Sequence, residues 1–204
     1  GVVFCSVAWG DYDNDGDLDI LMTGYGADYT SLIYRNDDGL FTDIGAGLTG
    51  VSSSSVAWGD YDNDGDLDIL LTGLDSDDNA LSLIYRNDTG LFTNISAGLT
   101  GVFNSSASWG DYDNDGDLDV LLTGSDLGGT FHSIIYRNNA PVANTAPNTP
   151  GNLSATLVGT EIQLDWDSAS DDETPAPGLT YNVRIGTTPG GSDLCTPMAL
   201  GSGY

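Results

Sequence analysis

The 204-residue chain has almost no positive charge. It contains no lysine, and its four arginines stand against 31 acidic residues, which gives a formal net charge of −27. A chain this acidic is repelled by nucleic-acid phosphates and by anionic membrane surfaces. No apolar run is long enough to cross a bilayer. We therefore expect no nucleic-acid partner and no membrane insertion.

Reactive side chains and helical signals are scarce as well. The single histidine, His132, has no nucleophile near it in the sequence, and the only cysteines are Cys5 and Cys195. We expect no enzymatic activity, and the sequence leaves open whether the two cysteines form a disulfide. No stretch has helical periodicity, whereas β-formers and turn residues are abundant, so an all-β chain is predicted.

What the chain does contain is a repeat. The eleven residues 9–19 return unchanged at 58–68 and again at 109–119, and the three copies start with Trp9, Trp58 and Trp109. The copies are 49 and 51 residues apart, and the residues between them vary. Identity in one segment against variation elsewhere indicates that this segment is constrained.

The spacing of the acidic residues in each copy indicates the constraint. Carboxylates stand at loop positions 1, 3, 5, 7 and 9, and glycine stands at position 6, where a chain that wraps around a small ion must turn. This is the pattern of an EF-hand-type calcium loop, in which position 7 offers its main-chain carbonyl. We expect about three calcium ions, one per repeat. The predicted ligands are Asp11, Asp13, Asp15, Asp17, Asp19, Asp60, Asp62, Asp64, Asp66, Asp68, Asp111, Asp113, Asp115, Asp117 and Asp119.

The loops differ from an EF-hand at position 12, where Met22, Leu71 and Leu122 replace the usual glutamate. The site is therefore expected to close on the aspartate at position 9 and to need no following helix. The alternative is an Asp-rich turn without metal. Five carboxylates within nine residues repel one another unless a cation neutralises them, which favours the metal. Magnesium demands octahedral geometry and zinc prefers His and Cys, so calcium is the predicted ion.

Each repeat predicts four short strands. In the first repeat they cover residues 6–9, 20–23, 32–35 and 40–42, and the third repeat lacks the Gly-Leu-Phe-Thr segment of the fourth strand. Gly24, Gly73 and Gly124 are expected to end the second strands. Four strands in about fifty residues are typical of a β-propeller blade. The tryptophans and the Tyr-Arg pairs are expected to pack in the core and between blades, and the variable segments 25–30, 75–81 and 126–132 are the expected places for a specific contact.

The motif Asp-x-Asp-x-Asp-Gly-x-x-Asp, present three times after Trp-Gly, resembles the FG-GAP/VCBS repeats of integrin α-subunit propellers and of many secreted bacterial proteins. The resemblance covers residues 1–138 and implies a calcium-binding propeller with the fifteen aspartates as ligands. In that family calcium is usually structural. Three blades do not close a ring, so we expect either a fragment or a structure that other copies complete.

The pattern changes after residue 138. Residues 139–150 are rich in proline and small polar residues and are predicted to be a linker. Residues 151–204 resemble the first half of a fibronectin type III domain, with strands at 153–157, 162–166 and 181–185. Such a sandwich needs about 100 residues. We expect a partial immunoglobulin-like or fibronectin III-like β-sandwich, either truncated or completed by strands of a neighbouring chain.

These observations predict an extracellular or cell-surface, secreted protein with a structural or adhesive role, in which calcium makes the blade loops rigid. Its partners would be other copies of itself or neighbouring protein domains, and the chain could form a surface fibre. The alternatives are a recognition module for a glycan or protein ligand and a non-catalytic part of a larger secreted enzyme.

Overall fold

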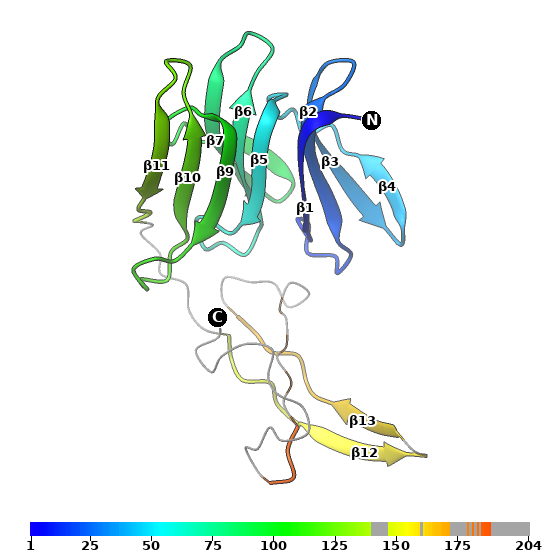
Figure 1. The fold of residues 1–204 in the computed structure, drawn as a ribbon. Helices are drawn as coiled ribbons and strands as arrows, with labels where there is room; N and C mark the ends of the chain where they lie inside the picture. The colour runs from blue at the N-terminus through cyan, green and yellow to red at the C-terminus, as the bar shows by residue number, and fades with distance from the viewer. Residues whose placement is uncertain are drawn as a thin grey trace.

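The computed structural model describes residues 1–139, 147–159, 161–171, 179, 181, 183 and 185–188. Throughout these ranges the chain is all-β, as predicted, and its strands form small antiparallel sheets (Figure 1). The same ranges contain no helix of a length and hydropathy that would span a membrane.

Three of the sheets follow one plan. Sheet 1 contains, in order, β1 (Val3–Gly10), β2 (Asp19–Tyr25), β3 (Tyr29–Asp37) and β4 (Leu40–Asp43). Sheet 2 contains β5 (Ser52–Gly59), β6 (Asp68–Leu74), β7 (Ala80–Asp88) and β8 (Leu91–Asn94). Sheet 3 contains only β9 (Phe103–Gly110), β10 (Asp119–Ser125) and β11 (Phe131–Tyr136). Within the described residues, the predicted strands and the shorter third repeat are confirmed.

The first two strands of each sheet carry the same irregularity. In sheet 1 the pairing shifts between Val3 and Ser6, where Phe4 has a φ of 50°, and Ser53 and Asn104 adopt the same conformation in the other sheets. Gly24 has a φ of 149°, and a Cβ atom there would lie 2.9 Å from the Cβ of Cys5. The prediction that this glycine ends the strand is wrong: β2 continues to Tyr25, and the glycine makes room for the bulge.

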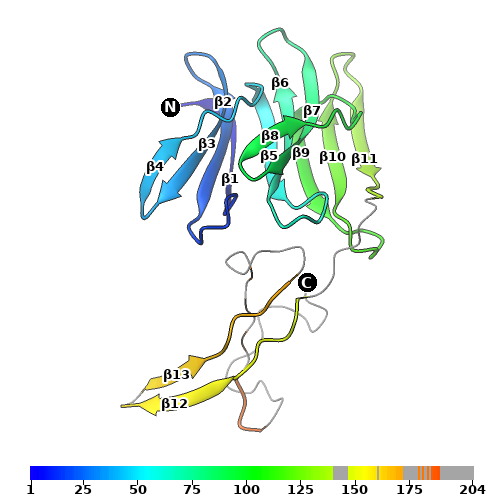
Figure 2. The same ribbon diagram turned by 180° about the vertical axis from the view of Figure 1, so that it is seen from behind.

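The three sheets stack side by side, with β1 against β5 and β5 against β9 (Figures 1 and 2). One apolar core lies between sheets 1 and 2, and a second lies between sheets 2 and 3. Sheet 2 is covered on both faces, so the first six residues of β6 are all buried rather than alternately buried and exposed.

Trp58, Trp109 and Tyr85 lie between sheets, as predicted, whereas Trp9 is exposed on the outer face of sheet 1. Trp58 lies so close to Gly10 that a Cβ atom on Gly10 would be 2.6 Å from the indole ring, and Trp109 covers Gly59 in the same way. The hydroxyl of Tyr85 accepts a hydrogen bond from the main-chain N–H of Thr49 at 3.0 Å. These contacts explain why Trp-Gly opens every copy of the repeated segment.

The prediction that the arginines belong to this packing is wrong. Arg35 forms an exposed ion pair with Asp37, and Arg86 forms one with Asp88, each with an Nη2–Oδ2 distance of 2.8 Å. The guanidinium keeps its hydration at the surface more easily than it would within an apolar interface.

The C-terminal region contains a separate hairpin, formed by β12 (Ser154–Val158) and β13 (Glu161–Asp165). This hairpin agrees with the strands predicted at 153–157 and 162–166. The strand predicted at 181–185 lies only partly within the described residues, and Cys195 and most of the linker lie outside them. The linker, the partial sandwich and the disulfide therefore stay predictions.

Candidate metal centres

The three Asp-rich loops connect the first and second strands of each sheet. In each loop the carboxylate at position 1 accepts hydrogen bonds from main-chain N–H groups four and five residues later, which curves the loop. Asp11 accepts the main-chain N–H of Asp15 at 3.1 Å on Oδ1 and that of Gly16 at 3.0 Å on Oδ2. Asp60 and Asp111 accept the corresponding bonds in the other two loops.

Two positions in each loop adopt left-handed backbone conformations that close this curve. In the first loop Asn14 has a φ of 56° and Gly16 has a φ of 96°. Asparagine tolerates this region because its short side chain bonds locally, and glycine has no Cβ that would clash. The three loops therefore share one conformation because they share one sequence.

The carboxylate at position 9 fixes the loop to the sheet. Asp19 is fully buried, and it accepts the N–H of Tyr12 at 3.0 Å on one oxygen and that of Asn36 at 2.8 Å on the other. Asp68 and Asp119 repeat both bonds. Each carboxylate oxygen has two lone pairs, so these oxygens keep acceptor capacity for a cation.

Burial acts strongly on the acidic groups of the second loop. Desolvation raises the pKa of Asp68 to about 7 and that of Asp60 to about 6, although main-chain hydrogen bonds oppose the shift in both groups. A buried carboxylate with a raised pKa is one whose negative charge lacks compensation. A divalent cation would supply that compensation.

The loops bring carboxylate oxygens together as a metal site requires. Three groups have ligand atoms within 4.8 Å of one another: Asp11, Asp13 and Asp15; Asp60, Asp62 and Asp68; Asp111, Asp113 and Asp115. The Oδ1 atoms of Asp62 and Asp113 are buried and have no hydrogen-bond partner. An unpartnered buried carboxylate oxygen is costly, and a cation in the group would satisfy it. Hard oxygen donors alone are the set that calcium prefers, so the residues present fit that ion.

The structure gives the side chain at position 7 another role. Asn14 donates through Nδ2 to Oδ1 of Asp66 in the next sheet at 3.1 Å, and Asn63 donates to Oδ1 of Asp117 at 2.9 Å. The other oxygen of Asp66 accepts the N–H of Thr89 at 3.0 Å. Asp66 and Asp117 therefore join neighbouring sheets through their side chains. The predicted main-chain contribution of position 7 to a metal stays a prediction.

The asparagines at position 4 are the residues that sequence reasoning missed. Their identity in all three copies was the available signal, because an EF-hand-type loop requires no particular residue there. Of the predicted ligands, nine fall within the three acidic groups. The remaining six are Asp17, Asp19, Asp64, Asp66, Asp117 and Asp119.

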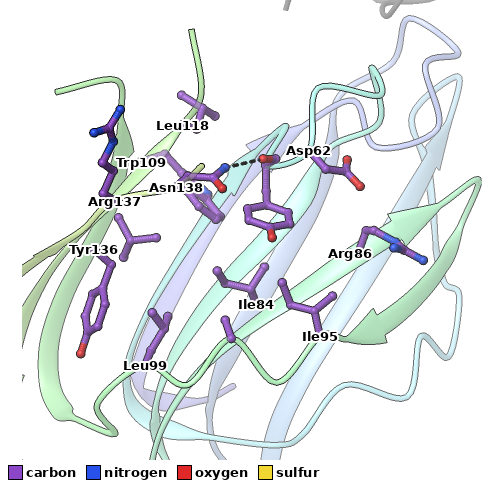
Figure 3. Close-up of a pocket in the computed structure, with 13 residues that line it drawn as sticks. Asp62, Ile84, Arg86, Ile95, Leu99, Trp109, Leu118, Tyr136, Arg137 and Asn138 are labelled. Carbon is purple, nitrogen blue, oxygen red and sulfur yellow. Dashed lines mark hydrogen bonds between the residues drawn. The ribbon is translucent and has the colours of Figure 1, made fainter. Parts of the chain in front are cut away.

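A cavity of about 620 Å³ lies between sheets 2 and 3, close to the second and third loops. Figure 3 shows Ile84, Ile95 and Leu99 along one side, with Trp109 and Tyr136 opposite them. Asn138 bridges the top of the cavity by donating from Nδ2 to the carbonyl of Tyr61 at 2.7 Å. Between sheets 1 and 2 the corresponding region is filled by Phe92, which contacts Tyr12 and Trp58.

These features define a class of protein: stacked antiparallel sheets, each with an Asp-rich loop suited to a divalent cation. A comparison with protein families gives the same result for part of the chain, because residues 11–71 match the model of the FG-GAP-like repeat. The match spans the first loop, the rest of sheet 1 and the second loop as far as β6. A search of the curated proteins finds no significant match.

Proposed function

We propose that the chain is an extracellular, non-catalytic calcium-binding module with a structural or adhesive role. The observation that carries the proposal is the unpartnered buried oxygen of Asp62 and of Asp113, each within a group of three carboxylates. The match of residues 11–71 to the FG-GAP-like repeat adds support. The extracellular location follows from the calcium available there, since loops of this kind in extracellular modules bind with dissociation constants of roughly 10⁻⁴–10⁻³ M.

In this proposal calcium acts through the fold. Each loop joins a strand beside the neighbouring sheet to the strand that follows it, and the carboxylate at position 9 also bonds to the third strand. A calcium ion would hold the loop carboxylates at short distance and remove their mutual repulsion. Because an unfolded chain offers no such arrangement, the binding free energy would stabilise the folded sheets.

The two end faces of the stack support an assembly role. Ile135, on the outer face of sheet 3, is 54% exposed, whereas its equivalent Ile33 is fully buried between sheets 1 and 2. Val7, on the outer face of sheet 1, is 64% exposed, whereas its equivalent Val56 is 7% exposed. Exposed apolar faces of this kind mark contacts with other protein surfaces.

These two faces are also complementary to one another. The contact between sheets 1 and 2 uses Tyr12 from one side and Trp58 with Phe92 from the other. At the ends of the stack, Tyr112 is exposed on sheet 3, while Trp9 and Phe41 contact each other on sheet 1 with ring centroids 6.2 Å apart. A second copy that placed sheet 1 on sheet 3 would complete the same aromatic group. Such a head-to-tail contact produces a ring or a filament.

A calcium titration of the full chain by calorimetry tests the binding part of the proposal. We expect about three ions per chain, and magnesium is expected to bind more weakly. Replacing Asp13, Asp62 and Asp113 with Ala removes the ligand at position 3 of each loop and should abolish binding. A charge-matched control replaces Asp28, Asp77 and Asp78, which lie in the loops between the second and third strands, and should keep all three ions. Equal loss in both variants would contradict the assigned sites.

Sedimentation analysis over a range of concentrations, in calcium, tests the assembly part. We expect association that Ile135→Asp abolishes and that Leu127→Asp, a change on an exposed loop, leaves intact. A chain that binds three calcium ions and stays monomeric at every concentration would overturn the assembly role and leave the calcium role standing.

A further inference from the structure

The three loops have the same eleven residues, yet the arginine that follows each of them behaves differently in the third repeat. Arg35 and Arg86 each bind the aspartate two residues later through Nε at 3.1 Å and Nη2 at 2.8 Å. Arg137 instead binds the third loop itself: its Nε lies 2.8 Å from Oδ2 of Asp113, and its Nη2 lies 2.8 Å from Oδ2 of Asp115.

The sequence supplies the cause of this difference. The residue two positions after the arginine is Asp37 in the first repeat and Asp88 in the second, but Asn139 in the third. An uncharged amide does not hold a guanidinium as a carboxylate does. Without its usual partner, Arg137 turns to the nearest carboxylates, which belong to the predicted calcium ligands. Figure 3 shows Arg86 and Arg137 on opposite sides of the cavity.

We propose that Arg137 is a tethered cation that competes with calcium for the third loop, so that this loop binds calcium more weakly than the other two. Asp113 and Asp115 belong to the group of three carboxylates there, and the guanidinium binds Oδ2 of each. A calcium ion in this group would compete with the positive charge of Arg137 for the two carboxylates. The inference rests on the proposed calcium-binding function.

The expected difference in affinity is modest, because Arg137 is half exposed and its ion pairs are partly solvated. Such pairs are individually weak, and displacing two of them would lower the affinity of the third loop by roughly tenfold. The chain would then respond to calcium in two steps, with loops 1 and 2 filled first and the third loop filled at higher concentration.

The test is a calcium titration of the full chain with two readouts. Calorimetry measures the affinities, and NMR monitors the amide resonances of Gly16, Gly65 and Gly116, one in each loop. We expect two tighter sites and one weaker site, with the resonance of Gly116 moving last. Arg137→Gln removes the competitor and should raise the affinity of the third loop by roughly tenfold. Asn139→Asp restores the partner that holds the arginine and should have the same effect without removing any charge from Arg137.

Arg86→Gln is the matched control, because Arg86 does not contact its loop; it should leave the second loop unchanged. Three equal affinities, or an unchanged third loop in both Arg137→Gln and Asn139→Asp, would overturn the inference while leaving the calcium function in place. No binding at any loop would overturn the calcium function as well, so the two failures are distinguishable.

Discussion

The contact between sheets 1 and 2 and the contact between sheets 2 and 3 share their polar bonds but differ in their apolar filling. In both, a tryptophan covers a glycine and an asparagine at position 4 bonds across to the next sheet. Among the described residues, the first contact contains a phenylalanine from a fourth strand, and the second contains a cavity of about 620 Å³. The repeated eleven residues therefore position neighbouring sheets, and the fourth strand completes the core between them.

This comparison also separates two uses of the same loop. Positions 1 and 3 bring carboxylates together in every loop, with position 5 in the first and third loops and position 9 in the second, while positions 4 and 7 join one sheet to the next. One short segment thus both forms the candidate metal site and sets the spacing of the stack. Calcium bound in the loop would consequently stabilise the contact between sheets as well as the loop itself.

The largest effect is expected from removing the ring that distinguishes the two contacts. Phe92→Ala should destabilise the fold by about 3–5 kcal/mol, because it opens a cavity at the complete contact. Phe41→Ala, at the equivalent but partly exposed position of sheet 1, should cost much less. Urea unfolding of both variants measures the difference, and equal losses would show that the ring does not act through the contact.

A second comparison uses the glycine that follows each tryptophan. Gly59→Ala would place a Cβ atom 2.5 Å from the ring of Trp109, and we expect a loss of about 1–3 kcal/mol from this overpacking. Gly110→Ala meets no atom within 4 Å and should be nearly neutral. Chemical denaturation of the pair measures the cost of separating sheets 2 and 3. A neutral Gly59→Ala would contradict the close contact.

The second loop predicts an unusual pH dependence. Asp60 and Asp68 have folded-state pKa values raised to about 6 and about 7, so the folded metal-free chain holds protons that the unfolded chain releases. Their contribution to stability is therefore fully present below pH 4 and is lost as the pH rises through 6 and 7. In metal-free buffer the melting temperature should fall between pH 5 and pH 8.

With calcium bound, the dependence of stability on pH should have the opposite sign. The bound ion requires ionised carboxylates, so acid releases it and the calcium-dependent part of the stability should fall as the pH drops from 7 to 5. Melting curves at matched pH values, with and without calcium, measure both trends. Parallel curves under the two conditions would contradict the assignment of these carboxylates to a metal site.

The smallest effect is expected at the asparagines. Asn63→Ala removes the bond to Asp117 and should cost about 1 kcal/mol. Asn114 is exposed and has the same left-handed φ of 59°. Asn114→Ala therefore measures the free-energy cost of placing alanine in that backbone conformation, which both variants share. Subtracting the two losses in unfolding free energy isolates the bond between sheets, and a difference of zero would contradict its role.

Much of this architecture was predictable because the repeats make it visible. Period-2 segments and turn residues predicted the strands of sheets 1 to 3, and the spacing of Asp11, Asp13 and Asp15 predicted an acidic group that the structure brings together. The three strands described for the third sheet agree with the missing Gly-Leu-Phe-Thr segment of that repeat. Local patterns sufficed for all of these features.

The remainder depends on contacts between sheets, which local patterns do not encode. The bond from Asn63 to Asp117 joins residues 54 positions apart. Arg137 stands at the same repeat position as Arg35 and Arg86, so the sequence pattern gives it the same role. Its different ion pair follows from residue 139, which is Asn where the other repeats have Asp. Gly24 was expected to end a strand because its role, making room for a bulge, appears only once the neighbouring strand is in place.

Thermal unfolding of the full chain in calcium and in EGTA at neutral pH tests the central claim most directly. At a calcium concentration about 100 times the dissociation constant, each occupied loop should add about 2.7 kcal/mol to the unfolding free energy, so the melting temperature should rise by well over 10 °C. The variant with Ala at positions 13, 62 and 113 should lose this rise, and the loop-charge control should keep it. Identical melting curves in calcium and in EGTA would contradict the claim that these loops are calcium sites.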